Sequence, residues 1–124
     1  MKILVCGGRD FKDRAKVHEI LKEYLHLKPN LTIIQGGQVT TDWKTGKKHG
    51  ADYLAKKWAE ANDVPCLEFK ADWNKYGKPA GMIRNQQMLD EANPDLVIAF
   101  KGGNGTADMV RRSRKHDKEV REIL

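Results

Sequence analysis

Residues 95–106 read Asp-Leu-Val-Ile-Ala-Phe-Lys-Gly-Gly-Asn-Gly-Thr, and this stretch decides the fold. It contains a continuous apolar run, Leu96 to Phe100, which is typical of a parallel strand covered on both faces. A glycine-rich turn follows, Gly102-Gly103-Asn104-Gly105, and Thr106 then opens a helix. Glycine permits positive φ and close approach to the backbone, and the free N–H groups of a helix start attract anions. The stretch therefore predicts a phosphate-binding turn, although glycine also suits any tight turn and Thr106 suits a plain helix cap.

Outward from this stretch, strand-like and helix-like segments alternate along the chain. Short apolar runs predict strands at residues 3–6, 31–34, 65–69, 95–100 and, at the edge of the sheet, 119–123. Apolar residues at helical spacing predict helices over residues 13–27, 51–59, 79–92 and from Thr106 onward. Residues 38–49 and 72–78 lack such spacing and are expected to be loops. The alternation predicts the α/β class: a Rossmann-like three-layer sandwich with a mainly parallel sheet of about five strands.

Length and composition fit one small domain over residues 1–124. The formal net charge is +6, and the apolar runs are too short to span a bilayer. No secretory signal is apparent, and Cys6 and Cys66 lie in strand-like runs where reduced core thiols are expected. We therefore expect a cytoplasmic protein without a membrane partner. The positive charge suits either a solvated basic face or attraction to phosphates.

Three pairs of glycines follow predicted strands: Gly7-Gly8, Gly36-Gly37 and Gly102-Gly103. In open parallel sheets, ligands bind beyond the carboxyl ends of the strands, where the strand order reverses. The glycine pairs fall at these ends, so we predict that they line a ligand site. Arg9 follows the first pair and offers a bidentate phosphate contact, or else is a solvated arginine in a tight turn.

Other charged and aromatic residues are candidates for the same site. Arg84 lies on an apolar helical stripe, so its charge needs a partner. That partner is a phosphate, the carboxylate of Asp52 or Asp72, or water that the side chain reaches by snorkelling to the surface. We favour the phosphate. Asp72 and Trp73 follow a strand, where an acid suits ribose hydroxyls and an indole suits stacking on a base, or simply packing of the loop. Asp52 is a further candidate, although a helix start also explains an acid there.

Metal and cofactor sites are not expected, because the histidines are scattered and none has metal-ligand spacing. Basic residues crowd the last predicted helix and its end: Arg111, Arg112, Arg114, Lys115 and Lys118. This cluster suits either the negative end of the helix dipole or contact with nucleic acid.

Several motifs occur in a recognisable order. They are Gly7-Gly8-Arg9-Asp10-Phe11, Gly50-Ala51-Asp52 with Trp58-Ala59, Ala71-Asp72-Trp73, Ala80-Gly81 with Arg84-Asn85 and Met88, and Gly102-Gly103-Asn104-Gly105-Thr106. Together they resemble the YspA-type, cpYpsA-related branch of the SLOG superfamily, from about residue 2 to 111. The resemblance implies a Rossmann-like fold and a nucleotide or nucleotide-derived ligand, held by the last glycine turn and by Arg84 and Asn85.

The superfamily also includes the Lonely guy phosphoribohydrolases, DprA-type DNA-binding proteins and sensors of nucleotide signals. In the hydrolases, an Arg-Lys pair and a glutamate three residues after the Gly-Gly-x-Gly-Thr threonine serve catalysis. This chain has Arg84-Asn85 and Met109 at those positions, with Asp108 one residue earlier. The departure puts hydrolysis in doubt. Residues 38–49 also exceed the usual link of the family, as a polar insertion that forms either a lid or a tolerated surface loop.

Three functions follow, in order of preference. The first is a sensor or sequestering domain for a phosphate-bearing nucleotide or nucleotide-derived ligand. The second is N-glycosidic hydrolysis of nucleoside phosphates, with Arg84 on the phosphate and Asp72 or Asp108 near the ribose. The third is DNA binding through the basic last helix, so nucleic acid is the less favoured partner. A homo-oligomer is compatible with each of them.

Overall fold

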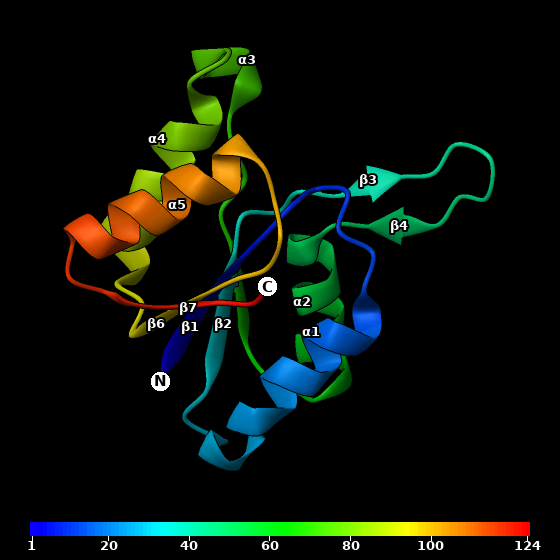
Figure 1. Ribbon diagram of the computed structural model, residues 1–124, viewed down its shortest axis with the longest axis vertical. Helices are drawn as coiled ribbons and strands as arrows, with labels where there is room; N and C mark the ends of the chain where they lie inside the picture. The colour runs from blue at the N-terminus through cyan, green and yellow to red at the C-terminus, as the bar shows by residue number, and fades with distance from the viewer.

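The computed structural model describes residues 1–124 and confirms the α/β class. One sheet contains all the long strands, in the order β5-β2-β1-β6-β7 (Figure 1). Their bounds are β1 Lys2–Cys6, β2 Thr32–Gln35, β5 Cys66–Glu68, β6 Leu96–Ala99 and β7 Glu119–Glu122. Every pairing in this sheet is parallel, and β7 joins β6 as the predicted edge strand.

Helices cover both faces of the sheet, which gives the three-layer sandwich seen in Figure 1. They are α1 Arg14–Leu21 with its 3₁₀ extension η1 Lys22–Leu27, α2 Ala51–Ala61, α3 Trp73–Tyr76, α4 Ala80–Gln87 with its π-helical extension η2 Met88–Ala92, and α5 Asn104–Lys115. Of these, α1 and α2 pack on one face, while η2 and α5 pack on the other. None of the helices is both long enough and apolar enough to cross a membrane.

The strands reach both apolar cores because successive side chains point to opposite faces of the sheet. In β1, Ile3 and Val5 belong to the core under α1 and α2, whereas Leu4 and Cys6 belong to the core under η2 and α5. The strands β1 and β6 are buried on both sides, which explains why they appear in the sequence as continuous apolar runs.

The order of the strands reverses beside β1. From β1 the chain proceeds to β2 and β5 on one side, and it then returns to β6 and β7 on the other. Cys6 is in register with Ala99, so the turns after β1 and β6 begin at the same level. A crevice opens between such turns at the carboxyl edge of a doubly wound sheet.

The expectation that residues 38–49 form a loop is wrong in part. They contain an antiparallel hairpin in which β3, Thr40–Thr41, pairs with β4, Lys48–His49. β-branched threonines favour extended backbone, but strands this short leave no periodic pattern in the sequence. Figure 1 shows the hairpin projecting away from the rest of the molecule.

Two helix starts also differ from the prediction. Residues 72–78 include the short helix α3, because the Asp72 side chain caps it and accepts a hydrogen bond from the Lys75 N–H group at 3.0 Å. Helix α5 begins at Asn104 rather than at Thr106, with Gly103 as its N-cap. The second half of the glycine turn is therefore already helical.

Gly7 offers a test of how closely the turn after β1 packs on its neighbours. A Cβ at Gly7 would lie 2.6 Å from the Ala51 Cβ and 3.0 Å from the Phe100 Cβ. We expect Gly7→Ala to lower the free energy of unfolding in urea by about 1–3 kcal/mol, because both neighbours are fixed in the core. Gly105→Ala is the control, since a Cβ there meets nothing and alanine favours a helix. Equal losses in the two variants would contradict the packing argument.

Candidate functional site

A cleft of about 920 Å³ lies at the carboxyl edge of the sheet, between the turns that follow β1 and β6. The start of α2 and the first half of α4 also contribute to its walls. The predicted ligand-binding residues that line the cleft are Gly7, Gly8, Arg9, Gly36, Asp52, Trp73, Arg84, Asn85, Gly102, Gly103, Asn104, Gly105 and Thr106. Asp108 lines it as well, whereas Gly37 and Asp72 do not.

The turns after β1 and β6 contact each other directly through their backbones. The Gly8 N–H group donates a hydrogen bond to the Lys101 carbonyl oxygen at 2.9 Å, and a Cβ at Gly8 would lie 3.1 Å from that oxygen. A Cβ at Gly102 would overlap the Thr106 hydroxyl group and lie 2.7 Å from the Gly8 nitrogen. Packing of the two turns therefore requires glycine at position 102 and favours it at position 8, independently of any ligand.

Gly103 differs from these two glycines. Its φ is −101°, so the expectation that this turn uses positive φ is wrong; the glycines with positive φ are Gly37, Gly46, Gly50 and Gly77. A Cβ at Gly103 would meet no atom within 4 Å, so the packing of neighbouring atoms does not require glycine there. No side chain caps α5, and residues 103–106 line the cleft. The N–H groups of the first turn of α5 are thus available to an anion.

The cleft also carries cations that lack partners within the protein. The side chains of Arg9, Lys12, Lys78 and Lys101 line it and form no ion pair or hydrogen bond. Of the acids beside them in the cleft, Asp13 caps α1 and Asp10 lies 3.9 Å from His49. Sequence reasoning identified only Arg9. The three lysines occupy turns beside predicted residues, but single lysines in polar turns carry no pattern that separates them from ordinary surface residues.

Arg84 is only 7% exposed and lies behind Gly36. Its guanidinium group donates to the Gly36 carbonyl oxygen at 2.5 Å and to Asn85 Oδ1 at 3.1 Å. A Cβ at Gly36 would overlap the guanidinium group, so this glycine makes room for the arginine. Burial lowers the pKa of Arg84. Its partners in the protein are amide oxygens, of the Gly36 peptide group and the Asn85 side chain, rather than an ion pair with Asp52 or Asp72. The side chain still lines the cleft.

Asp52 is a buried carboxylate in the first turn of α2, where it lines the cleft. It accepts a hydrogen bond from the Gln38 N–H group at 3.1 Å. Burial raises the pKa of Asp52 to about 6, while that hydrogen bond and the charge of Arg84 oppose the rise. A buried carboxylate has acceptor capacity for several hydrogen bonds, so a ligand hydroxyl group is a suitable further partner.

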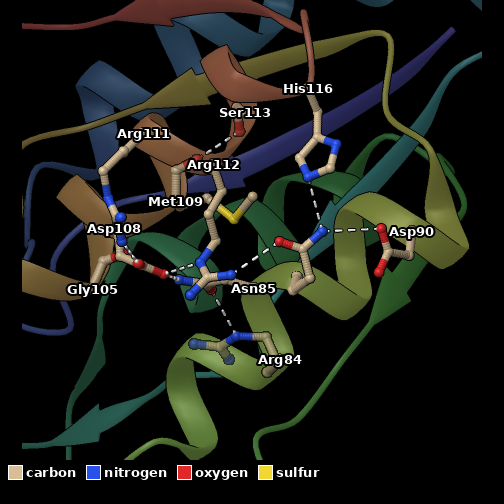
Figure 2. A network of polar contacts seen from close by, with 11 residues as sticks. Arg84, Asn85, Asp90, Gly105, Asp108, Met109, Arg111, Arg112, Ser113 and His116 are labelled. Atoms are coloured by element: carbon tan, nitrogen blue, oxygen red, sulfur yellow. Dashed lines mark hydrogen bonds and ion pairs between the residues drawn. The ribbon is translucent and has the colours of Figure 1, made fainter.

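A polar network joins α4 to α5 beside the glycine turn (Figure 2). Asn85 Nδ2 donates to the Gly105 carbonyl oxygen at 3.2 Å and to Asp108 Oδ2 at 3.1 Å. Asp108 also accepts from Arg111 and, at 2.8 Å, from Arg112. Burial acts to raise the pKa of Asp108, but the hydrogen bonds from Asn85 and the arginines outweigh it and lower the pKa. Asp108 is therefore an ionised acceptor that positions the start of α5.

The remaining predicted residues lie at the rim. Trp73 is 52% exposed and packs beside Gly81, where a Cβ would lie 3.3 Å from the indole ring. Asp72 points to the start of α3, which it caps. Gly37 lines a smaller pocket of about 370 Å³ that shares Arg9, Gly36 and Arg84 with the main cleft.

The arginines of the basic cluster on the last helix are paired with acids within the protein, whereas Lys115 forms no ion pair. Arg111 and Arg112 bind Asp108, as described above, and Arg114 lies 2.8 Å from Glu122. Lys118 donates a hydrogen bond to the Asn93 side chain. These contacts favour a structural role for the cluster.

Comparison with known proteins agrees with this fold. The YspA, cpYpsA-related SLOG family matches residues 1–76. The chain belongs to this family, as the motifs predicted. The matched segment includes the turns after β1 and β2, Asp52 and Trp73, while the turn after β6 lies beyond it. The Gene 61 protein of Mycobacterium phage D29 is 34% identical over 122 residues, and the alignment covers 92% of this chain and 89% of that protein.

The raised pKa of Asp52 predicts a pH-dependent loss of stability. The folded protein holds this proton up to a pH of about 6, whereas the ordinary value is 3.8, so ionisation opposes folding as the pH rises through this window. We expect Asp52→Asn to raise the free energy of unfolding at pH 7 by about 1–3 kcal/mol and to leave it nearly unchanged at pH 3.5. Urea denaturation from pH 3.5 to 8 measures this difference. A constant difference between the two proteins across that range would contradict the assignment.

Proposed function

We propose that this protein binds a nucleotide or nucleotide-derived ligand and serves as a sensor or sequestering domain for it. One observation carries the proposal: the uncapped start of α5 and four unpartnered cations converge on a single cleft at the point where the strand order reverses. A helix start and nearby cations together favour a phosphate group. Membership of the SLOG family supports a nucleotide as the carrier of that phosphate.

The arrangement of the cleft suits the remaining parts of a nucleotide. We place the phosphate at Gly103 and the first turn of α5, within reach of Arg9 and Lys101. Asp52, buried in the wall, suits a ribose hydroxyl group because an ionised carboxylate only accepts hydrogen bonds. Trp73 at the rim is half exposed and suits a base, which gains by stacking on an indole ring.

Hydrolysis of the glycosidic bond is less well supported. That reaction needs a carboxyl group placed to transfer a proton or to stabilise an oxocarbenium-like transition state. Asp108 lines the cleft, but its oxygens accept from Asn85, Arg111 and Arg112, and its lowered pKa makes it a poor proton donor. Met109, at the position of the hydrolase glutamate, is 1% exposed and belongs to the apolar core.

Substitution at Gly103 tests the phosphate site without a packing clash. We expect Gly103→Ala to weaken binding of AMP and Gly103→Val to abolish it, because each added carbon takes up space beside the start of α5, where Gly103 lines the cleft. Calorimetry with AMP and GMP measures affinity, and urea denaturation confirms that stability is retained. Native mass spectrometry of the wild-type protein identifies any ligand that is purified with it. Unchanged affinity in both variants would remove the phosphate site from the proposal.

A turnover assay separates the sensor from the enzyme. We expect release of free base from nucleoside monophosphates to be no faster with the wild-type protein than in its absence. Asp108→Asn should not change that rate, but it should lower the free energy of unfolding by about 1–3 kcal/mol, because buried hydrogen bonds to charged arginines are weakened. Chromatography of the reaction products measures the first effect and urea denaturation the second. Steady turnover by the wild type that is lost in Asp108→Asn would show that the protein is a hydrolase.

A further inference from the structure

The β3–β4 hairpin carries a surface that the cleft does not use. Its turn, residues 42–47, lies at the end that projects from the molecule (Figure 1). Trp43 in this turn is 86% exposed, more than Trp73 or Tyr76. The Lys44 ammonium group lies over its ring, at 5.3 Å from the ring centroid. Neither residue lines the cleft or the smaller pocket beside it. Because a single exposed apolar residue is common on protein surfaces, the case for a partner rests on the charges that surround this indole.

The turn that holds Trp43 is well ordered by hydrogen bonds. Asp42 Oδ1 accepts from the N–H groups of Lys44 at 2.8 Å and Thr45 at 3.3 Å. The Asp42 carbonyl oxygen accepts from Gly46 N–H at 2.7 Å, and its own N–H group donates to the Lys47 carbonyl oxygen at 2.8 Å. Asp42 Oδ1 and the Asp42 backbone groups are therefore hydrogen-bonded within the turn, and this holds Trp43 in a defined conformation.

The charge around Trp43 is mainly positive. Lys44, Lys47 and Lys48 are exposed and form no ion pair, and Asp42 is the only acid between residues 38 and 49. Their ammonium groups suit phosphates, and an exposed indole suits an unpaired base. An anionic membrane is a poorer match, because apart from Trp43 the turn contains only aspartate, lysine, threonine and glycine, with little apolar area to insert.

We propose that the hairpin tip binds single-stranded nucleic acid, with Trp43 stacked on a base and Lys44 and Lys47 on the flanking phosphates. The inference rests on the hairpin alone and not on the ligand of the cleft. It differs from DNA binding by the last helix, whose arginines are already paired. Double-stranded DNA fits less well, because its bases are stacked on one another and do not offer a free face to the indole ring.

The test uses fluorescence anisotropy of a labelled dT12 oligonucleotide without a terminal phosphate, titrated with the full chain at several salt concentrations. We expect Trp43→Ala to weaken binding roughly 5- to 100-fold, the range for loss of one base–aromatic stack. Lys44→Gln/Lys47→Gln should reduce the slope of log K against log salt by about 1.4, for two single-strand phosphate contacts. Its control is Lys22→Gln/Lys115→Gln, which removes the same charge from exposed positions on η1 and α5 and should leave both quantities unchanged.

Three further readouts decide between the alternatives. Trp43→Ala should bind AMP as the wild type does, so a failure of the hairpin is distinguishable from a failure of the cleft. Addition of dT12 should quench tryptophan fluorescence in the wild type and not in Trp43→Phe. Vesicles of phosphatidylcholine and phosphatidylglycerol should cause no blue shift of that fluorescence. Absence of dT12 binding, equal losses in the two double variants, or a Trp43-dependent response to vesicles alone would overturn the proposal.

Discussion

The hydrogen bond from the Gly8 N–H group to the Lys101 carbonyl oxygen is the constraint on which the site depends. It joins two turns that the chain separates by more than ninety residues, and it does so where the strand order reverses. A Cβ would overlap its neighbours at Gly102 and would crowd the Lys101 carbonyl oxygen at Gly8. Because the contact fixes where β6 ends, it also fixes where α5 begins and where its N–H groups point. The cleft is thus a consequence of how two strands terminate.

The α4–α5 network holds the other side of the same turn. Asn85 connects Arg84, Asp108 and the Gly105 carbonyl oxygen, so a single amide relates the buried guanidinium group to the start of α5. Several acids that line the cleft have partners elsewhere: Asp108 pairs with arginines of its own helix, Asp13 caps α1, and Asp10 lies 3.9 Å from His49. Arg9, Lys12, Lys78 and Lys101 form no ion pair or hydrogen bond through their side chains, so the cleft keeps cations without partners.

The sequence was informative where a feature repeats or is forced by backbone geometry. Apolar runs located the long strands, helical spacing located α1, α2 and α4, and glycine pairs located the edge at which the cleft lies. Features that depend on contacts between distant segments could not be predicted. Nothing in the sequence pairs Asn85 with Gly105, and nothing distinguishes Lys78 from other lysines. The two-residue strands β3 and β4 are too short to show a period, and α3 depends on a single capping aspartate.

Gly103 shows how packing separates residues that look alike in sequence. Gly7, Gly8 and Gly102 each face atoms that leave no room for a side chain, so their presence follows from the fold. Gly103 has open space where a Cβ would be, so the packing of neighbouring atoms does not account for it. Selection for stability would favour a capping side chain such as serine or aspartate at this N-cap position. Glycine at this position gives the helix start no side-chain acceptor. The N–H groups of the first turn of α5 therefore remain free to donate hydrogen bonds into the cleft, which is the arrangement that favours an anion.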